Sequence, residues 1–370
     1  LYFYDIPIFS QINNFYFTEY GVVYNTSILN IINEDPDLDN FRRNKQISSD
    51  DFRQKLNIYY QEILKPNYKL NVLNDIQILL KRSIAPSEIG LIVYVTMSPD
   101  YITRPATACI IAHRLGMADD CLAFDVNLGC SGFIYGLNIT ASMLMANQTD
   151  KALLVCGDTT NKDIYGYSGE RNHSDLMLFG DAGSAVLLEK DVGVDEIYVN
   201  GRTDGSGYLS IINPYGGFRH PGIPVGNKNA IMDEFAVFNF STSKAPELIN
   251  ETMEKMGTTP DSYDCLVLHQ ANLLIMQRIA KKTGFPKEKL LVSINDFGNT
   301  SSASIPVTLV KYYGNSEHYQ KIHVLMSGYG VGLSWGVADV YIDTGNIYQL
   351  VQTEEYFKDD FQYNNKKGYL

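Results

Sequence analysis

Residues 124–133 read FDVNLGCSGF and combine a short apolar strand, a glycine turn and the first turn of a helix. Gly129 permits the sharp turn because it can adopt backbone dihedrals that are closed to other residues. Cys130 is then expected at or beside the helix N-terminus, where unpaired backbone N–H groups and the helix dipole lower a thiol pKa. The stretch therefore predicts a nucleophilic cysteine. The alternative is a buried, inert cysteine, which is a common fate of free thiols.

The helix that follows Cys130 is predicted to lie in the centre of a large core. Residues 126–149 contain no charged side chain, a composition also typical of a membrane span. Three asparagines and the turn near Gly129 interrupt the run, so we favour a central helix. Gly132 and Gly136 lie one turn apart and allow this helix to pack closely against a neighbour.

Composition excludes several classes of protein. The chain has 370 residues, of which 45% are hydrophobic and 19% charged, which is ample for a large core. The formal net charge of −12 argues against nucleic-acid binding. The five cysteines form no C-x-x-C pair and no zinc-ligand spacing, which indicates reduced thiols in a cytosol. The apolar N-terminus has no basic region, so no signal peptide is predicted. We expect a cytoplasmic protein that binds neither membrane nor nucleic acid.

Strand and helix patterns alternate along the chain and occur twice in the same order. Strands are predicted at residues 89–97, 122–126, 151–157 and 179–188, and again at 263–269, 290–294, 321–326 and 327–342. Helices are predicted between them, at 105–115, after Cys130, at 271–283 and at 300–313. Strands that alternate with helices at this spacing indicate parallel-sheet units. Two copies in one order predict a duplicated α/β fold.

The repeat suggests a division of the chain into two halves and a tail. We assign residues 1–190 to an N-terminal half that carries the cysteine, 191–344 to a C-terminal half, and 345–370 to a polar C-terminal tail. Residues 191–262 are interpreted as the link between the copies. They contain the glycine- and proline-rich segment 201–226, and a loop of that length usually covers a site.

Two further residues are predicted to join Cys130 in one site. Ligand sites of duplicated α/β folds collect at the C-terminal ends of strands. His269 ends one predicted strand and Asn299 follows another. Alone, such a histidine is more often a hydrogen-bonded structural residue, and such an asparagine is more often a cap. Three such residues at equivalent strand ends predict a catalytic set.

Several longer motifs carry a resemblance to a known family. They are FDVNLGCSGFIYGL at 124–137, FGDAGSAVLLE at 179–189, DGSGYLSIINP at 204–214, HQAN at 269–272, GNTSS at 298–302 and GYGVGLSWG at 328–336. In this order they resemble the β-ketoacyl-acyl-carrier-protein synthase III family of the thiolase superfamily. The combination of Cys, His and Asn is similar to these initiating synthases, whereas the elongating synthases use two histidines.

The resemblance implies a thiolase-like five-layer α-β-α-β-α fold with two pseudo-equivalent halves, and a homodimer. It implies that Cys130 holds the acyl group as a thioester, and that His269 and Asn299 stabilise an enolate. The backbone N–H groups of Cys130 and Val331 are expected to form the oxyanion hole for the acyl-cysteine. The implied substrates are acyl-CoA or acyl-acyl carrier protein and malonyl-acyl carrier protein, with no metal or redox cofactor.

The implied reaction is decarboxylative Claisen condensation to a 3-oxoacyl product, as in the initiation of fatty acid synthesis. Two alternatives stay open. In one, the same acyl-cysteine passes its acyl group to an oxygen or nitrogen acceptor in a specialised pathway. In the other, the chain is an inactive partner subunit kept for dimerisation, which the intact Cys130, His269 and Asn299 disfavour.

The carrier-binding region departs from the family pattern. Family members commonly carry an arginine two residues after the Asn of HQAN, where this chain has Leu274. Because carrier protein is acidic, a local cation is needed, and Arg278 lies one helical turn further on. Carrier or CoA contacts are predicted for Gln270, Ala271, Asn272, Leu273, Leu274 and Arg278. An ordinary solvated helix face is the alternative.

Two other departures concern the acyl group and its donor. Arg104 falls where family members place an apolar or aromatic residue on a loop that reaches the acyl pocket of the partner subunit. A cation there would select a polar or carboxylated acyl group, unless it points to solvent. The segment that binds the CoA nucleotide in the family is hard to find, and Arg42 and Arg43 are the nearest candidates.

Overall fold

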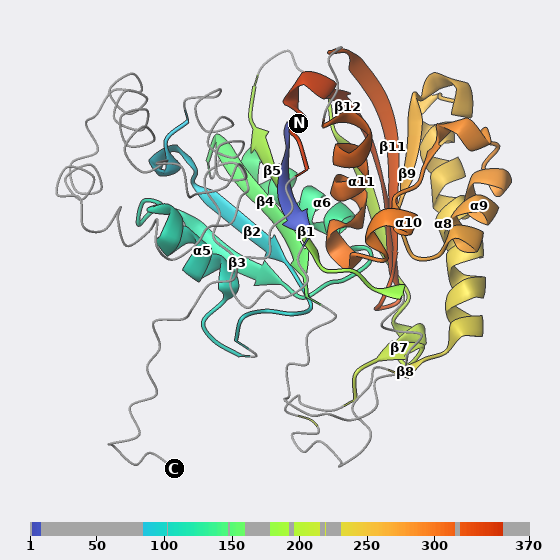
Figure 1. Cartoon of the computed structure of the whole chain (residues 1–370), viewed down its shortest axis with the longest axis horizontal. Coiled ribbons are helices and arrows are strands. Elements are labelled where there is room, and N and C mark those ends of the chain that lie inside the picture. Colours follow the sequence, from blue (N-terminus) through green and yellow to red (C-terminus); the bar gives the residue numbers. More distant parts are fainter. Residues whose placement is uncertain are drawn as a thin grey trace, which may run out of the picture.

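The computed structural model describes residues 84–101, 103–146, 149–159, 178–191, 196–214, 219, 231–314 and 319–350, together with the backbone of residues 2–8. These residues form two five-stranded sheets that lie side by side with helices between them and on their outer faces (Figure 1). Arg42 and Arg43, the candidate nucleotide contacts, lie outside the described residues.

The first sheet contains the strand that leads to Cys130. Its order is β1 (Tyr2–Ile8), β5 (Ala182–Glu189), β4 (Lys151–Asp158), β2 (Leu91–Val95) and β3 (Leu122–Val126). β2 runs parallel to β3 and β4, while β5 is antiparallel to β4 and β1. Every residue of β2 is buried, as expected for an apolar run that is covered on both faces.

The second sheet repeats this arrangement. Its order is β10 (Leu290–Leu291), β9 (Cys265–Leu268), β11 (Lys321–Gly330), β12 (Ser334–Asp343) and β6 (Tyr198–Thr203). β9 runs parallel to β10 and β11, while β12 is antiparallel to β11 and β6. Strand order and strand direction are therefore the same in both sheets, and the predicted duplication is confirmed.

Five layers follow from the way the helices cover these sheets. α6 (Gly132–Met145) and α11 (Ser304–Tyr313) lie between the two sheets and contact strands of both. α5 (Thr107–Leu115) covers the outer face of the first sheet, and α8 (Glu234–Met256) and α9 (Leu273–Lys282) cover that of the second (Figure 1). Shorter elements complete the described chain: η1 (Pro86–Glu88), η2 (Gly205–Gly207), β7 (Ile211–Ile212), β8 (Ile231–Met232), η3 (Pro260–Ser262), η4 (Lys287–Lys289), α10 (Ile294–Phe297), η5 (Ser301–Ala303) and η6 (Thr344–Asn346).

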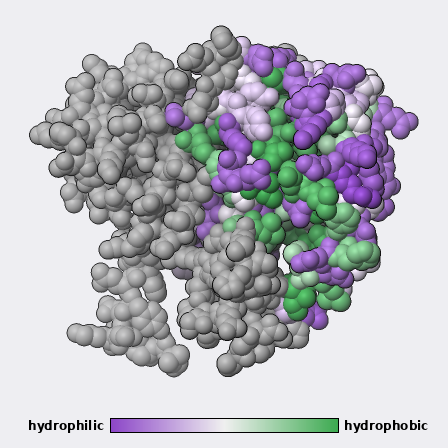
Figure 2. All heavy atoms as spheres, turned by 45° about the vertical axis from the view of Figure 1, so that its right-hand side comes forward, coloured by the Kyte–Doolittle hydropathy of each residue, from purple (hydrophilic) through white to green (hydrophobic). Residues whose placement is uncertain are grey.

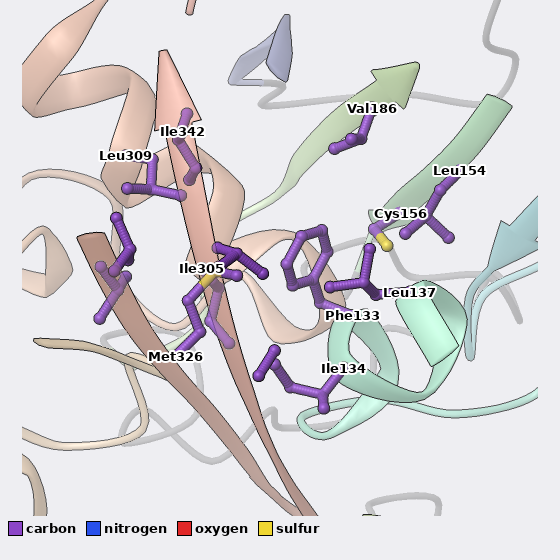
Figure 3. Packing of buried hydrophobic residues seen from close by; sticks show 14 of the residues in the cluster. Phe133, Ile134, Leu137, Leu154, Cys156, Val186, Ile305, Leu309, Met326 and Ile342 are labelled. Carbon is purple, nitrogen blue, oxygen red and sulfur yellow. The ribbon is translucent and has the colours of Figure 1, made fainter. Parts of the chain in front are cut away.

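Close packing of α6 positions the cysteine turn. A Cβ built on Gly132 would lie 2.5 Å from the side chain of Val95, and one on Gly136 would lie 2.6 Å from that of Leu154. The two glycines thus let α6 lie directly on β2 and β4, as predicted. On its other side, Phe133 of α6 lies beside Ile305 of α11 in the central core (Figure 3).

None of the described helices is both long and apolar enough to span a membrane.

The sequence prediction was wrong for the segment between the copies. Residues 191–262, interpreted as a link, contain β6, β7, β8 and the long helix α8. The caps of α8 were readable signals: Asp233 accepts a hydrogen bond from the N–H of Ala236, and Gly257 ends the helix in the left-handed conformation. The strand predicted at 290–294 is also too long, because α10 begins at Ile294.

The C-terminal end of the described chain packs onto the body of the protein. Ile347 and Tyr348, within the segment predicted as a polar tail, are buried, and Ile347 belongs to the central core. Residues 351–370 lie outside the described residues.

Candidate active site

Segments from both halves meet around Ser301. Its Oγ lies 3.2 Å from the point that a Cβ on Gly129 would occupy, next to Cys130. Its N–H donates to Oδ1 of Asn299 at 3.0 Å, and its backbone raises the pKa of His269, which places it beside that ring. The structure therefore brings together the three segments that the sequence predicts to form one site.

Cys130 is half-buried in the turn between β3 and α6, two residues before the helix begins. Burial has the largest effect on its pKa and raises it. The backbone N–H groups of Val331 and Cys130 lower the pKa, and the charge of Asp158 raises it further. The resulting pKa of the thiol is about 11. The nearby N–H groups lower the pKa, as the sequence predicts for this turn, but desolvation of the thiolate outweighs them.

The β11–β12 hairpin brings a backbone donor to the sulfur. Gly330 pairs with Ser334 across the hairpin, and Val331 begins its tip. A Cβ built on Gly330 would lie 2.8 Å from the Sγ of Cys130, so a side chain there would collide with the nucleophile. The backbone N–H groups of Val331 and Cys130 both lower the pKa of this thiol.

His269 is buried at the end of β9 and lies edge-on to the ring of Tyr329, with the ring centroids 5.7 Å apart. Its Nδ1 lies 2.7 Å from Oγ of Ser304, and the Tyr329 hydroxyl donates to its carbonyl oxygen at 3.1 Å. Among the described residues its Nε2 is buried and has no hydrogen-bond partner. Burial lowers the pKa of His269 to about 3, against a smaller opposite effect of the Ser301 backbone. The imidazole is therefore neutral near pH 7.

Asn299 is held by the backbone of the FGDAG motif. Its N–H donates to the carbonyl of Leu178 at 2.7 Å, and its own carbonyl accepts from the N–H of Gly180 at 3.1 Å. A side chain on Gly180 would collide with the carbonyl of Phe297, so the motif requires glycine at this position. Because Oδ1 of Asn299 accepts from the N–H of Ser301, the amide presents its NH₂ group elsewhere.

Asp158 is a buried residue of the site that the sequence analysis missed. It ends β4, where it accepts hydrogen bonds from Oγ1 of Thr96 at 3.1 Å and from the N–H of Met97 at 2.7 Å. Its other oxygen accepts from Oγ of Ser302 at 2.7 Å and from the N–H of Ser302 at 3.2 Å. Burial raises the pKa of this carboxyl, and the hydrogen bonds oppose the increase. Asp158 joins the first sheet to the turn that carries Asn299. The sequence does contain a signal for this residue, because a carboxylate at the end of a buried apolar strand needs hydrogen-bond partners.

The predicted carrier contacts separate into buried and exposed residues. Gln270 is completely buried, donates to the carbonyl of Leu268 at 2.8 Å and accepts from the N–H groups of Ser293 and Ile294. The prediction that Gln270 contacts a carrier is therefore wrong: it ties β9 to the start of α10.

The exposed members of the set lie on and around α9. Asn272 caps the helix by accepting from the N–H of Leu274 at 2.8 Å. Leu274 is 62% exposed, while Ala271 and Leu273 are half-buried. The guanidinium of exposed Arg278 lies over the ring of Phe238, 5.8 Å from its centroid.

Arg104 is exposed on the loop before α5. No cluster of three or more His, Cys, Asp or Glu side chains in the described part of the chain has the arrangement of a metal site.

This fold and site define a class of protein: a thiolase-fold acyltransferase with a cysteine, a neutral histidine and an asparagine at the junction of its halves. Two family models match the chain. The model of the family described as "3-Oxoacyl-[acyl-carrier-protein (ACP)] synthase III" matches residues 124–205, and the model of the C-terminal part of this family matches residues 253–342.

Named proteins and solved structures agree with these matches. The β-ketoacyl-[acyl-carrier-protein] synthase III of Clostridium perfringens is 33% identical over 266 residues, which covers 70% of this chain and 80% of that protein. The structure of a 3-oxoacyl-(acyl-carrier protein) synthase from Burkholderia xenovorans matches with a TM-score of 0.69 at 26% identity, covering 95% of this chain and 97% of that one. A priming β-ketosynthase of a polyketide pathway matches with a TM-score of 0.62 at 29% identity, over 75% of this chain and 83% of that one. The chain belongs to the 3-oxoacyl-[acyl-carrier-protein] synthase III family and is an acyltransferase.

Proposed function

We propose that the protein performs the initiating condensation of fatty acid synthesis, joining an acyl group on Cys130 to a malonyl thioester. The observation that carries this proposal is the buried His269 Nε2, which has no protein partner among the described residues and lies at the same junction as Cys130 and Asn299. A buried polar atom without a partner is costly, so it is expected to meet a substrate.

In the first step the Cys130 sulfur attacks the carbonyl of an acyl thioester. The carbon–sulfur bond to the carrier or CoA breaks, a new thioester forms on Cys130, and the thiol proton ends on the leaving thiol. Charge on the carbonyl oxygen is stabilised by the N–H groups of Cys130 and Val331, the two backbone groups that lower the pKa of the thiol.

In the second step a malonyl thioester loses carbon dioxide and its enolate attacks the acyl-cysteine. The 3-oxoacyl product leaves, and the Cys130 thiolate takes up a proton. His269 Nε2 and the Asn299 amide donate to the enolate oxygen. This needs the proton on Nε2. Ser304 Oγ can accept the N–H of Gln270 at 3.4 Å and give its own proton to His269 Nδ1, which leaves the ring proton on Nε2. The reaction needs no metal or redox cofactor.

An acidic acyl carrier protein is the proposed donor of the malonyl group. Arg278 on α9 provides a cation beside exposed Leu274. Large exposed apolar side chains also concentrate where η2, β7, β8 and the first turn of α8 meet: Tyr208, Leu209, Ile231, Met232 and Phe235 (Figure 2). This surface adjoins the hairpin tip, because the N–H of Asp204 donates to the carbonyl of Leu333 at 2.8 Å. We propose that the carrier docks on this apolar surface and on the exposed side of α9 that carries Arg278, and that it passes its thioester arm to Cys130.

The homodimer is proposed from an edge of the first sheet. Among the described strands β3 is the one at this edge, and Leu122 on it is 44% exposed. An apolar edge strand is a template for pairing with a second copy. Arg104, exposed on a nearby loop, would then reach the acyl pocket of the other copy and select a polar acyl group. We retain residues 1–190 and 191–344 as the two halves and the cytoplasm as the location. The segment 345–370 is retained as a C-terminal extension whose first residues, including Ile347, pack into the core.

The test is the mass of the intact protein after incubation with acetyl-CoA, longer acyl-CoAs and acyl-acyl carrier proteins. We expect an acyl adduct that is absent from Cys130→Ala. Addition of malonyl-acyl carrier protein should then remove the adduct and release carbon dioxide. Adduct transfer to an alcohol or amine without carbon dioxide would instead support the oxygen- or nitrogen-acceptor reaction. No adduct from any donor would contradict the proposal and favour an inactive partner subunit.

A further inference from the structure

The proposed oxyanion hole draws one donor from each half of the molecule. The N–H of Cys130 comes from the turn after β3, and that of Val331 from the tip of the β11–β12 hairpin. These segments belong to different sheets, so neither sheet by itself fixes the spacing of the two donors. Oxyanion donors are effective only when they are held at the correct separation before the reaction.

A pair of buried serines bridges these two segments. Ser131 follows the nucleophile, and its Oγ lies 2.6 Å from Oγ of Ser334. Ser334 Oγ also donates to the carbonyl of Val331 at 2.7 Å. The bridge therefore runs from the residue after one donor to the residue that supplies the other.

The direction of the bridge follows from the number of protons. Each hydroxyl has one proton to donate, and a carbonyl oxygen can only accept. Because Ser334 gives its proton to Val331, it must accept the proton of Ser131. Ser131 therefore donates to Ser334, and Ser334 donates to the Val331 carbonyl.

Burial makes the bridge hard to replace. Ser131 is completely buried and Ser334 is 2% exposed. A Cβ built on Gly332 would lie 3.0 Å from Oγ of Ser334, so the tip is closely packed around this hydroxyl. Removal of the Ser131 hydroxyl breaks the bridge and leaves Ser334 without its donor, and removal of the Ser334 hydroxyl also frees the Val331 carbonyl.

We propose that Ser131 and Ser334 are positioning residues that set the separation of the two oxyanion donors. The inference rests on the proposed function, since it assumes that an acyl-cysteine forms on Cys130. It assigns the serines no contact with substrate. Their effect reaches the reaction through the hairpin tip.

Two reactions of the same sulfur separate this role from a general loss of structure. Acylation by a thioester places negative charge on the carbonyl oxygen and needs both donors. Alkylation by iodoacetamide displaces iodide at a saturated carbon and forms no oxyanion. A misplaced Val331 should therefore slow acylation more than alkylation: both reactions lose the effect of its N–H on the thiol pKa, but only acylation also loses a donor to the oxyanion.

The experiment compares Ser131→Ala, Ser334→Ala and the double variant with wild type. Acylation is followed by intact mass with acetyl-CoA and acetyl-acyl carrier protein, and alkylation with iodoacetamide at one pH. We expect each single variant to acylate roughly 10- to 100-fold more slowly, with the double variant no slower than the worse single one, because the serines act as one unit. The matched control is Ser327→Ala, a buried serine of the same hairpin whose Oγ donates to the Gly336 carbonyl at 3.0 Å, away from the tip.

The outcomes distinguish this inference from the function on which it rests. Wild type that acylates, with serine variants that acylate equally fast, would reject the bridge alone. Equal slowing of acylation and alkylation, or the same loss in Ser327→Ala, would also reject it, because the effect would then be one of folding. Wild type that forms no adduct with either donor would reject the proposed function, and the inference with it.

Discussion

The segments that follow β3 and β10 come after equivalent strands of the two sheets but hold their side chains differently. Asn299, after β10, is fixed by backbone hydrogen bonds on both sides and by Ser301. Cys130, after β3, is half-buried beside a hairpin tip from the other half. The difference suits their proposed tasks, because the nucleophile must be reached by successive thioesters, whereas an enolate donor must stay in one orientation.

Burial acts in opposite directions on the two titratable groups of the site. It raises the pKa of Cys130 to about 11 and lowers that of His269 to about 3. Both shifts favour the uncharged form, since a low-dielectric site disfavours any isolated charge. The resting site is therefore neutral at these two residues, and charge develops only when substrate supplies it.

The largest expected effect separates the two halves by function. We expect His269→Ala and Asn299→Ala each to slow condensation about 10²–10³-fold, because each removes one donor to the enolate. Both variants should still form the acyl adduct on Cys130, whereas Cys130→Ala should form none. Intact mass and carbon dioxide release measure the two steps. Loss of the adduct in His269→Ala would show that the halves do not divide the work in this way.

A second change tests the connection between the halves. Asp158→Ala leaves the donors on Thr96, Met97 and Ser302 without their acceptor, so we expect roughly 3 kcal/mol less free energy of unfolding. Urea denaturation measures the change. The control is exposed Asp261→Ala, which should stay within about 0.5 kcal/mol of wild type. Equal stability of both variants would mean that Asp158 does not hold the halves together.

The pH dependence of alkylation sharpens the comparison of the two pKa values. Because the pKa of Cys130 is about 11, its thiolate fraction is small at neutral pH and rises with pH. We expect the iodoacetamide rate at Cys130 to rise about tenfold per pH unit between pH 6 and 9. Cys130→Ala gives the background from other thiols. A rate that levels off below pH 8 would indicate that the resting thiolate is stabilised after all.

The smallest expected effect concerns the surface of the second half. Arg278→Glu replaces the cation beside Leu274 by an anion, so we expect the KM for malonyl-acyl carrier protein to rise about three- to tenfold. Acylation from acetyl-CoA should not change, since that donor needs no carrier surface. Lys287→Glu, a charge reversal in η4 beyond the end of α9, is the control. Equal effects of both variants would indicate general repulsion between acidic proteins rather than a docking site.

Local patterns in the sequence predicted most of the fold and the three central residues of the site. Strands that are covered on both faces appear as continuous apolar runs, and the stretch at 124–133 shows its turn through Gly129. The positions of Cys130 and His269 at strand ends follow from the alternation of strands and helices, whereas Asn299 lies after the short helix α10, which the sequence analysis did not predict. These features depend on neighbours in the chain, so they can be read without the structure.

Tertiary structure decided the properties that depend on contacts between distant segments. The pKa of Cys130 follows from desolvation beside the β11–β12 hairpin, which outweighs the local effect of the helix N-terminus. Gln270 lies in a motif typical of carrier contacts, yet it is buried and connects β9 to the start of α10. Asp158 connects the halves only because β4 ends against the turn of Asn299. Desolvation and hydrogen-bond partners are set by which segments meet in space, and no single stretch of sequence contains that information.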